Sequence, residues 1–273
     1  MLKANNSAPD TVAQVNTLRT DAQALTKVLE GEGLSVQPHG WMPDCLILES
    51  TGNIEHMKAF RDGLFYVQDP AARLAVQAAG LAPNMNILDC CSAPGGKSFA
   101  AALAMKNKGR IISCDIHSHK IELLKKGAER LGITIMDPMQ QDASQFVPDW
   151  ENSMDAVIAD VPCSGLGVIR KKPDIRYKDP DTMKELPALQ LQILKNQARY
   201  VRPGGVLLYS TCTLVRRENE GVVEKFLKAN PEFSLEPLKL PAEFGENTTG
   251  MLTLVPGEHD TDGFFIARLR RRS

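Results

Sequence analysis

The chain has 273 residues, of which 43% are hydrophobic and 24% charged, a composition typical of a globular protein with a large core. Its net charge of −1 and its 5% of aromatic residues exclude a nonspecific nucleic-acid coating protein but leave room for a local basic groove. The absence of a bilayer-length apolar run, of a secretory signal and of any Cys-x-x-Cys pair among the six cysteines predicts a cytoplasmic protein with reduced thiols and no metal.

The first 66 residues predict a small α/β unit. Val12–Asn16 is a candidate strand, and Asp21 is a suitable N-cap for an apolar-periodic helix over Ala22–Leu29. Gly31 ends that helix, and Leu46–Leu48 supplies a further strand. Because this unit is small for an independent enzyme, we expect it to handle a substrate.

Beyond Gly63 strands and helices alternate, which predicts parallel βαβ units with right-handed crossovers. The expected strands are Asn86–Cys90, Arg110–Cys114, Ile133–Met136, Asp155–Ala159 and Gly205–Ser210. The expected helices are Asp69–Ala79, Gly96–Met105, His117–Leu131, Met183–Val201 and Asn219–Ala229. Met251–Val255 and Gly263–Leu269 predict a closing antiparallel hairpin, which a purely parallel dinucleotide-binding fold would not need.

The loop Ser92–Ser98 follows a predicted strand and ends in a sequence that imitates a P-loop. A P-loop needs a glycine five residues before Gly96, where Cys91 stands, and Pro94 lacks an N–H that a phosphate cradle would use. No Gly-x-Gly-x-x-Gly fingerprint is present either. We therefore expect a tight Gly95-Gly96 turn at a helix N-terminus, where backbone N–H groups meet a polar ligand, with a plain glycine turn as the alternative.

Two aspartates follow the next two predicted strands. Asp115 lies about twenty residues after the glycine turn, where a carboxylate can accept both hydroxyls of a ribose, although a helix N-cap is equally expected of it alone. Asp142 could accept from an adenine amino group or cap a turn. Together with the glycine turn they indicate an adenosine-bearing ligand without a pyrophosphate. S-adenosylmethionine fits that description, whereas NAD and ATP do not.

Cys163 and Cys212 each follow directly on a short apolar strand. Ligands of an open parallel sheet bind beyond the carboxyl ends of its strands, so both thiols are expected to face one crevice. Nearby basic side chains lower the pKa of a thiol, and the thiolate is a strong nucleophile. Core packing is the alternative for either cysteine alone, but two thiols beside a ligand-binding turn favour covalent chemistry in a cofactor-dependent enzyme.

Several motifs, spread over almost the whole chain, carry a family resemblance: Phe60–Asp69, Ser92–Lys97, Asp115, Asp142, Asp160–Gly165, Ser210–Cys212 and Asp262–Phe265. In combination they resemble the Nol/Nop/Sun (Fmu) RNA cytosine-C5 methyltransferases, most closely the bacterial small-subunit ribosomal RNA branch. The resemblance implies an α/β fold: a Rossmann-like methyltransferase sheet with a C-terminal antiparallel strand over residues 67–273, preceded by a small RNA-facing α/β domain over residues 1–66. That branch carries a helical RNA-binding domain before the part matched here.

The resemblance also implies roles for individual residues. It places S-adenosylmethionine against Cys91, Ser92, Ala93, Pro94, Gly95, Gly96, Lys97, Asp115, Asp142 and Asp160. It makes Cys212 the nucleophile that adds to C6 of cytosine, Cys163 the group that assists release of the adduct, and Asp160 a hydrogen-bond partner of the N3 edge. Spacing alone does not choose between the two cysteines, since the Pro-Cys thiol is the nucleophile in DNA cytosine methyltransferases. Gln14 stands where the family has a basic residue.

The implied partner is RNA with a flipped or single-stranded cytosine, in ribosomal RNA first. Two basic groups could contact phosphates or simply be solvated: Arg170, Lys171, Lys172, Arg176 and Lys178, and the terminal Arg268, Arg270, Arg271 and Arg272. The alternatives are a tRNA cytosine-C5 methyltransferase of the same family, a methyltransferase for DNA, protein or a small molecule, and a non-enzymatic RNA-binding module. We expect no membrane partner and a monomer.

Overall fold

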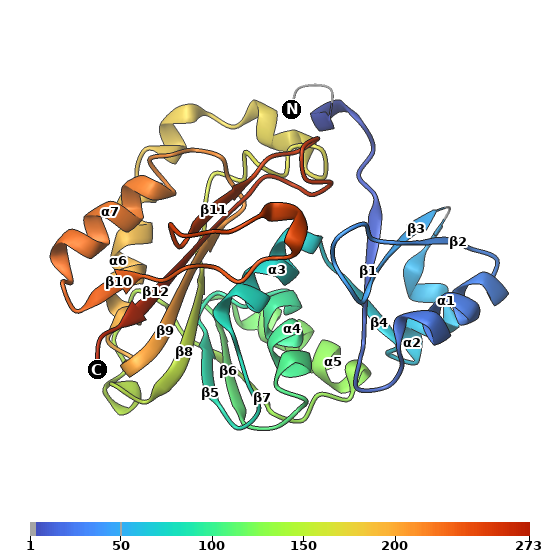
Figure 1. The fold of residues 1–273 in the computed structure, drawn as a ribbon, viewed down its shortest axis with the longest axis horizontal. Coiled ribbons are helices and arrows are strands. Elements are labelled where there is room, and N and C mark those ends of the chain that lie inside the picture. Colours follow the sequence, from blue (N-terminus) through green and yellow to red (C-terminus); the bar gives the residue numbers. More distant parts are fainter. Residues whose placement is uncertain (1–3, 50) are drawn as a thin grey trace.

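The computed structural model describes residues 4–49 and 51–273, which form two separate β-sheets (Figure 1). A small sheet and its helices occupy one side of the molecule, and a larger sheet with helices on both faces makes up the rest. Within these ranges no helix is long and apolar enough to span a bilayer.

The small sheet uses residues up to Val67. Its strands are β1 (Thr11–Val15), β2 (Ser35–Pro38), β3 (Cys45–Glu49) and β4 (Phe65–Val67), paired antiparallel in the order β2-β3-β1-β4. Helix α1 (Ala22–Gly31) buries Leu25 and Leu29 against this sheet, and α2 (Lys58–Arg61) precedes β4. Asp21 is the N-cap of α1, as predicted, and its carboxylate accepts the backbone N–H of Ala24 at 2.8 Å.

The large sheet has eight strands. They are β5 (Asn86–Asp89), β6 (Arg110–Asp115), β7 (Met136–Gln140), β8 (Met154–Asp160), β9 (Val201–Thr211), β10 (Phe233–Leu235), β11 (Met251–Leu254) and β12 (Phe264–Arg271). The order is β10-β12-β9-β8-β5-β6-β7, with β11 also paired to β12. Strands β5 to β9 are mutually parallel, whereas β12 runs antiparallel to β9, β10 and β11.

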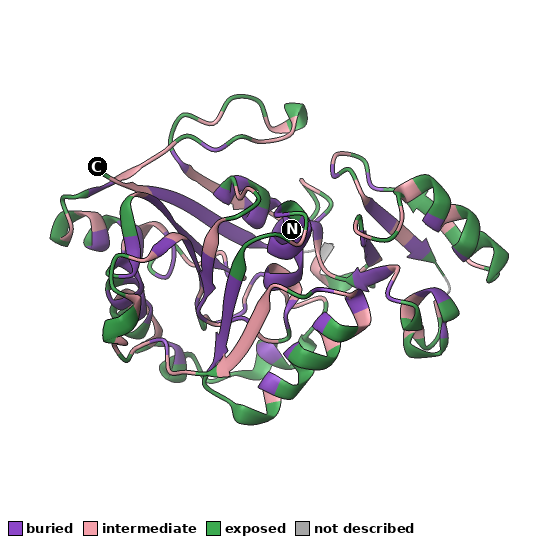
Figure 2. Cartoon of the chain, turned by 90° about the horizontal axis from the view of Figure 1, so that it is seen from below, coloured by how far each residue is buried: buried purple, intermediate pink, exposed green. Residues whose placement is uncertain are grey.

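Helices cover both faces of the large sheet. They are α3 (Pro70–Ala79), α4 (Gly96–Ala104), α5 (Ser118–Leu131), α6 (Leu186–Ala198) and α7 (Glu220–Ala229). Because successive strand residues point to opposite faces, Ile158 of β8 packs in the cluster of α3 and α4, whereas Val157 packs in the cluster of α6 and α7. Figure 2 shows the result: the central strands are buried and the outer helix surfaces are exposed. Short 3-10 helices complete the fold: η1 (Ala4–Asn6), η2 (Ile54–His56), η3 (Pro148–Trp150), η4 (Pro173–Tyr177), η5 (Pro180–Met183) and η6 (Ala242–Phe244).

The predicted α/β fold is confirmed, including the closing antiparallel hairpin of β11 and β12. One strand was predicted wrongly: Ile133–Met136 was expected, but β7 covers Met136–Gln140. Strand β7 contains Asp137 and Pro138, which are poor strand formers, and it is tolerated because it lies at the edge of the sheet. The short strands β2, β4 and β10 were not predicted.

Candidate active site

The loops that follow β5, β8 and β9 meet at one edge of the large sheet. The chain builds β5, β6 and β7 outward and then returns to β8 on the other side of β5, so the strand order reverses between β5 and β8. Two cavities open at this switch point, and their sizes suit small-molecule sites. We call them the loop cavity, of about 630 Å³, and the thiol cavity, of about 650 Å³. Both are lined by Cys91, Ala93, Pro94, Lys97 and Asp160.

The two cysteines converge on the thiol cavity, where the Sγ atoms of Cys163 and Cys212 lie 3.3 Å apart. The next residues are joined as well, because the hydroxyls of Ser164 and Thr213 lie 2.8 Å from each other. The carboxylate of Glu218 accepts the backbone N–H of Ser164 at 2.9 Å and so holds the loop that contains Cys163. Since β8 and β9 are parallel neighbours, their loops leave the sheet side by side and bring both thiols to one place.

A close backbone crossing holds these loops together. The N–H of Gly167 donates to the carbonyl of Cys212 at 3.0 Å, and the N–H of Gly263 donates to the carbonyl of Gly167 at 2.8 Å. A Cβ on Gly167 would lie 2.1 Å from the Gly263 oxygen, so only glycine fits there. The loops after Cys163 and Cys212 and the loop before β12 therefore share one fixed arrangement.

The two thiols differ in acidity. A hydrogen bond from Cys163 lowers the pKa of Cys212, and the charges of Lys97 and Lys172 act in the same direction against the effect of burial. The same hydrogen bond, with burial, raises the pKa of Cys163 well above its ordinary value. The pair therefore favours a thiolate on Cys212 with the proton kept on Cys163.

Asp160 ends β8 beside the thiols and makes two strong contacts. Its Oδ2 lies 2.6 Å from Nζ of Lys97, and its Oδ1 accepts the hydroxyl of Ser210 at 2.7 Å. Burial opposes the charge of Lys97, but Asp160 outweighs it and raises the pKa of Lys97. The site thus places a carboxylate and a lysine ammonium against the cavity that contains the sulfur atoms.

The glycine turn lies between the two cavities. Gly95 has φ +116° and is the N-cap of α4, with no side chain capping the helix, so the first N–H groups of α4 are available to a ligand. A Cβ on Gly96 would lie 2.5 Å from Nε2 of Gln68. Ser92 is buried and donates its N–H and hydroxyl to the Cys114 carbonyl, at 2.7 and 3.0 Å, which ties the loop to β6. A helix N-terminus with free backbone N–H groups, in a loop that is not a phosphate-binding loop, fits the carboxylate of an amino-acid ligand such as S-adenosylmethionine.

The two adenosine-site candidates differ in their placement, since Asp115 lines the thiol cavity and Asp142 lines neither cavity. Asp115 ends β6, lines the thiol cavity, accepts the N–H of His117 at 3.0 Å and lies 3.6 Å from Lys120. Asp142 accepts the N–H and hydroxyl of Ser144, both at 2.8 Å, and therefore also caps a turn. No group of three or more metal-ligating side chains occurs among the described residues.

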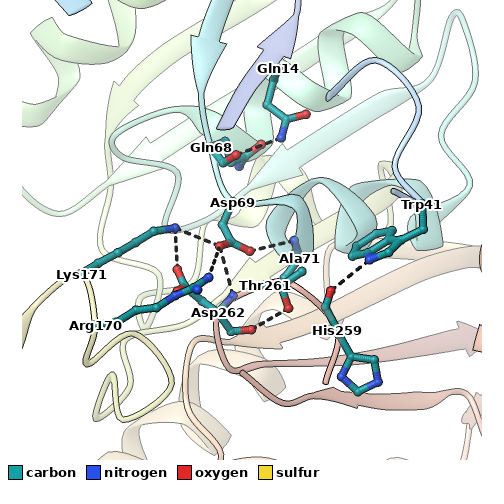
Figure 3. Close-up of polar contacts among 10 residues, drawn as sticks. All are labelled: Gln14, Trp41, Gln68, Asp69, Ala71, Arg170, Lys171, His259, Thr261 and Asp262. Carbon is teal, nitrogen blue, oxygen red and sulfur yellow. Dashed lines mark hydrogen bonds and ion pairs between the residues drawn. The ribbon is translucent and has the colours of Figure 1, made fainter. Parts of the chain in front are cut away.

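An ion-pair network forms another wall of the thiol cavity (Figure 3). Asp262 contacts Nε of Arg170 and Nζ of Lys171, each at 2.6 Å, and Asp69 contacts Lys171 at 2.9 Å. Asp69 also caps α3 by accepting the N–H of Ala71, and it accepts the N–H of Asp262 at 3.1 Å. Burial works against the ionised form of Asp69, but Lys171 outweighs it and lowers the pKa of Asp69.

Most of the basic side chains for which phosphate contact or solvation was predicted have partners within the protein. Arg170 and Lys171 belong to the network above, and Arg176 donates to Asn5 and Asn6. In the terminal group, Arg268 and Arg270 pair with Glu236, and Arg271 donates to Asn152 and to the carbonyl of Val201. Buried carboxylates and carbonyls need donors, and these arginines supply them. Lys172 and Lys178 remain on the cavity wall.

The small sheet packs against the large unit beside this wall (Figure 3). Nε1 of Trp41 donates to the carbonyl of His259 at 3.0 Å. Gln14 is fully buried, donates to the carbonyl of Gln68 at 2.9 Å and accepts from Cys45 at 2.8 Å. This position therefore serves the core of the interface and does not reach solvent.

Sequence reasoning missed the residues that position the cysteines. Gly167 and Glu218 carried no motif of their own, and Gln190, which donates to the Pro162 carbonyl at 2.9 Å, lies inside a predicted helix. Ser164 and Thr213 follow the cysteines directly, so their paired placement after each thiol was the one local signal available.

A family model described as 16S rRNA methyltransferase RsmB/F matches residues 77–270. The chain belongs to the RsmB/F family. A model of the ferredoxin-like domain of RsmF/B-like methyltransferases matches residues 1–55. These matches confirm the family resemblance and assign β1, β2 and β3 of the small sheet to the ferredoxin-like domain.

Individual relatives agree with the family assignment. The probable ribosomal RNA small subunit methyltransferase B of Bacillus subtilis is 38% identical over 97% of this chain, and the chain spans 60% of that relative's length. The crystal structure of PH0851 is 34% identical, with a TM-score of 0.92 over 98% of this chain and 61% of the other. NSun6 from Pyrococcus horikoshii, solved with SFG, shares the fold at 22% identity, with a TM-score of 0.88 over 100% of this chain and 93% of the other.

Proposed function

We propose that this protein methylates C5 of a cytosine in small-subunit ribosomal RNA with S-adenosylmethionine. The observation that carries the proposal is the pair of sulfur atoms 3.3 Å apart, in a cavity that is also lined by Ala93, Pro94 and Lys97 on either side of the glycine turn. Family membership and the names of the relatives support the RNA substrate. We further propose that the RNA-facing unit covers residues 1–66 and the methyltransferase unit residues 67–273.

The reaction begins with the thiolate of Cys212. Cytosine C5 is a weak nucleophile, and addition of Sγ to C6 makes C5 enamine-like. The hydrogen bond from Cys163 and the charge of Lys97 favour the thiolate in the free protein. The carboxylate of Asp160 accepts a hydrogen bond from the protonated N3 edge and so stabilises the adduct, while Lys97 keeps that carboxylate oriented.

The residues that would hold S-adenosylmethionine are the glycine turn, Asp115, Asp142 and Asp160. When bound there, the cofactor supplies an electrophilic methyl group to C5. After methylation a water molecule takes the proton from C5, the electron pair of that C–H bond restores the C5–C6 double bond, and the Sγ–C6 bond breaks with its electron pair returning to Cys212 as the free thiolate. Cys163 lies next to that bond and assists its cleavage.

The test separates the two thiols. Cys212→Ala is expected to abolish methyl transfer to an in vitro transcript of small-subunit ribosomal RNA and to abolish covalent capture of that RNA. Cys163→Ala is expected to accumulate an RNA adduct that survives denaturing electrophoresis. Tritium released from C5-labelled cytosine reports the reaction, and bisulfite sequencing locates the product.

Other outcomes would overturn parts of the proposal. Normal turnover by Cys163→Ala together with RNA trapping by Cys212→Ala would reverse the two roles. Methylation of tRNA or DNA, with the ribosomal transcript left unmodified, would replace the substrate and leave the chemistry. Cys45→Ala is a matched control, because that thiol is buried in the small domain and hydrogen-bonded to Gln14.

A further inference from the structure

The segment 165–178 follows Cys163 and passes along the mouth of the thiol cavity; we call it the lip. Six of its residues line that cavity: Gly165, Val168, Lys172, Asp174, Ile175 and Lys178. Its last part is the 3-10 helix η4. The lip is therefore one of the segments that RNA would meet when it extends outward from a base held against the thiols.

The lip is fastened at several points. At its start Gly167 exchanges backbone hydrogen bonds with the loops of Cys212 and Gly263. In its middle Arg170 and Lys171 are held by Asp69 and Asp262 (Figure 3). At its end the side chain of Ile175 is buried, and Arg176 donates to Asn5 and Asn6 at 2.7 Å. A surface residue carried on such a segment has a fixed position.

Tyr177 stands at the end of η4 with its side chain in solvent. It is 87% exposed, the largest value among the exposed large hydrophobic residues of the described chain. Over residues 4–49 and 51–273, its ring stacks on no other ring and its hydroxyl has no hydrogen-bond partner. Burying a tyrosine ring is favourable. A ring that stays exposed on a firmly held segment is therefore available to pack against a ligand.

The surroundings of Tyr177 indicate RNA as that ligand. Two basic side chains of the lip, Lys172 and Lys178, line the thiol cavity together with one acidic side chain, Asp174, and this excess of positive charge suits a phosphate backbone. Reaching C6 on either face requires the target cytosine to leave its stack. The base beside it then loses a neighbour and exposes an aromatic face, for which a tyrosine ring is a substitute.

We propose that Tyr177 stacks on the base adjacent to the target cytosine and thereby favours the unstacked state of the RNA. This inference rests on the proposed function, and it adds a subsite for the flanking nucleotide. The ring would contact the flat face that every base has, so the subsite accepts any base. The stacking contact disappears when either the ring or the base is removed.

The experiment compares variants at this one position. Tyr177→Ala is expected to lower kcat/KM for the ribosomal transcript by about 5- to 150-fold, the range for loss of one base–aromatic stack. Tyr177→Phe, which keeps the ring, stays within about twofold of the unchanged protein. The KM for S-adenosylmethionine is unchanged in both. Leu189→Ala removes another exposed apolar side chain, on α6, and is the matched control.

A second readout does not depend on methylation. Binding of a fluorescein-labelled short oligoadenylate with one central cytidine is measured with an intact or an abasic neighbour of the cytidine. Loss of that base is expected to weaken binding to the unchanged protein and to have no added effect on Tyr177→Ala. The inference would be overturned if removing the base and removing the ring weakened binding independently, so that the two fold-changes in affinity multiplied. It would also be overturned if Tyr177→Ala and the unchanged protein had equal kcat/KM and equal affinity. If the unchanged protein methylates no RNA, the proposed function fails, and the binding comparison still decides on stacking.

Discussion

The ion-pair network of Figure 3 makes a quantitative prediction about Asp262. Its side chain is only 3% exposed and contacts both Arg170 and Lys171. Asp262→Asn keeps the shape of the side chain but leaves two cations facing the single carboxylate of Asp69. The variant is therefore expected to lose stability and to disturb the lip that Arg170 and Lys171 fasten.

The magnitude follows from burial. Removing one partner of a buried ion pair costs about 3–5 kcal/mol, and we reduce this to about 2–4 kcal/mol because Lys171 is 31% exposed and can regain water. For a chain of this size that free energy corresponds to a fall in Tm of roughly 4–16 °C. The double variant with Lys171→Met and Asp262→Asn keeps one acidic and one basic side chain, Asp69 and Arg170. Its loss of unfolding free energy should therefore be smaller than the sum of the losses from the two single changes.

Urea unfolding and calorimetry of the four proteins measure this coupling. Asp137→Asn is the matched control, since Asp137 pairs with Arg110 where both side chains are about half exposed, and its cost should stay below about 1 kcal/mol. A loss for Asp262→Asn as small as that of the control, or additive single changes, would refute the reasoning. Intact RNA methylation by a destabilised Asp262→Asn protein would show that the network does not position the lip.

Three further outcomes are expected. Iodoacetamide near neutral pH should alkylate Cys212 before Cys163, as peptide mass spectrometry would show, because the shared hydrogen bond lowers only the pKa of Cys212; equal rates would contradict the assignment. Burial raises the pKa of Asp89 to about 7, so the folded state keeps a proton that the unfolded state loses near pH 4. The free energy of unfolding should therefore fall as pH rises from about 4 to about 7, and Asp89→Asn should remove that decline, whereas parallel pH profiles would count against it. Gly167→Ala would bring a Cβ within 2.9 Å of the Cys212 carbonyl and should cost at least about 1–3 kcal/mol in urea unfolding, unlike Gly31→Ala, whose Cβ meets nothing within 4 Å; equal costs would disprove the crossing's importance.

Much of the site could be predicted because its residues sit at the ends of apolar strands. Cys163, Cys212, Asp115 and the glycine turn were recognised in this way, and the structure brings the first two within 3.3 Å. The strand β7 was misplaced because an edge strand tolerates Asp137 and Pro138, which a local pattern counts as breaks. Spacing alone left the choice between the two thiols open, since the difference between their pKa values depends on a hydrogen bond between residues 49 positions apart in the chain.

The sequence by itself determined the succession of strands and helices and the chemistry at strand ends, because apolar periodicity, caps and glycine turns act over a few residues. The tertiary structure alone decided which charges meet. Arg170 and Lys171 could have served RNA phosphates, yet they neutralise Asp69 and Asp262, whose partners come from segments about a hundred residues away. A buried carboxylate binds whichever cation the fold brings near, and no local pattern contains that information.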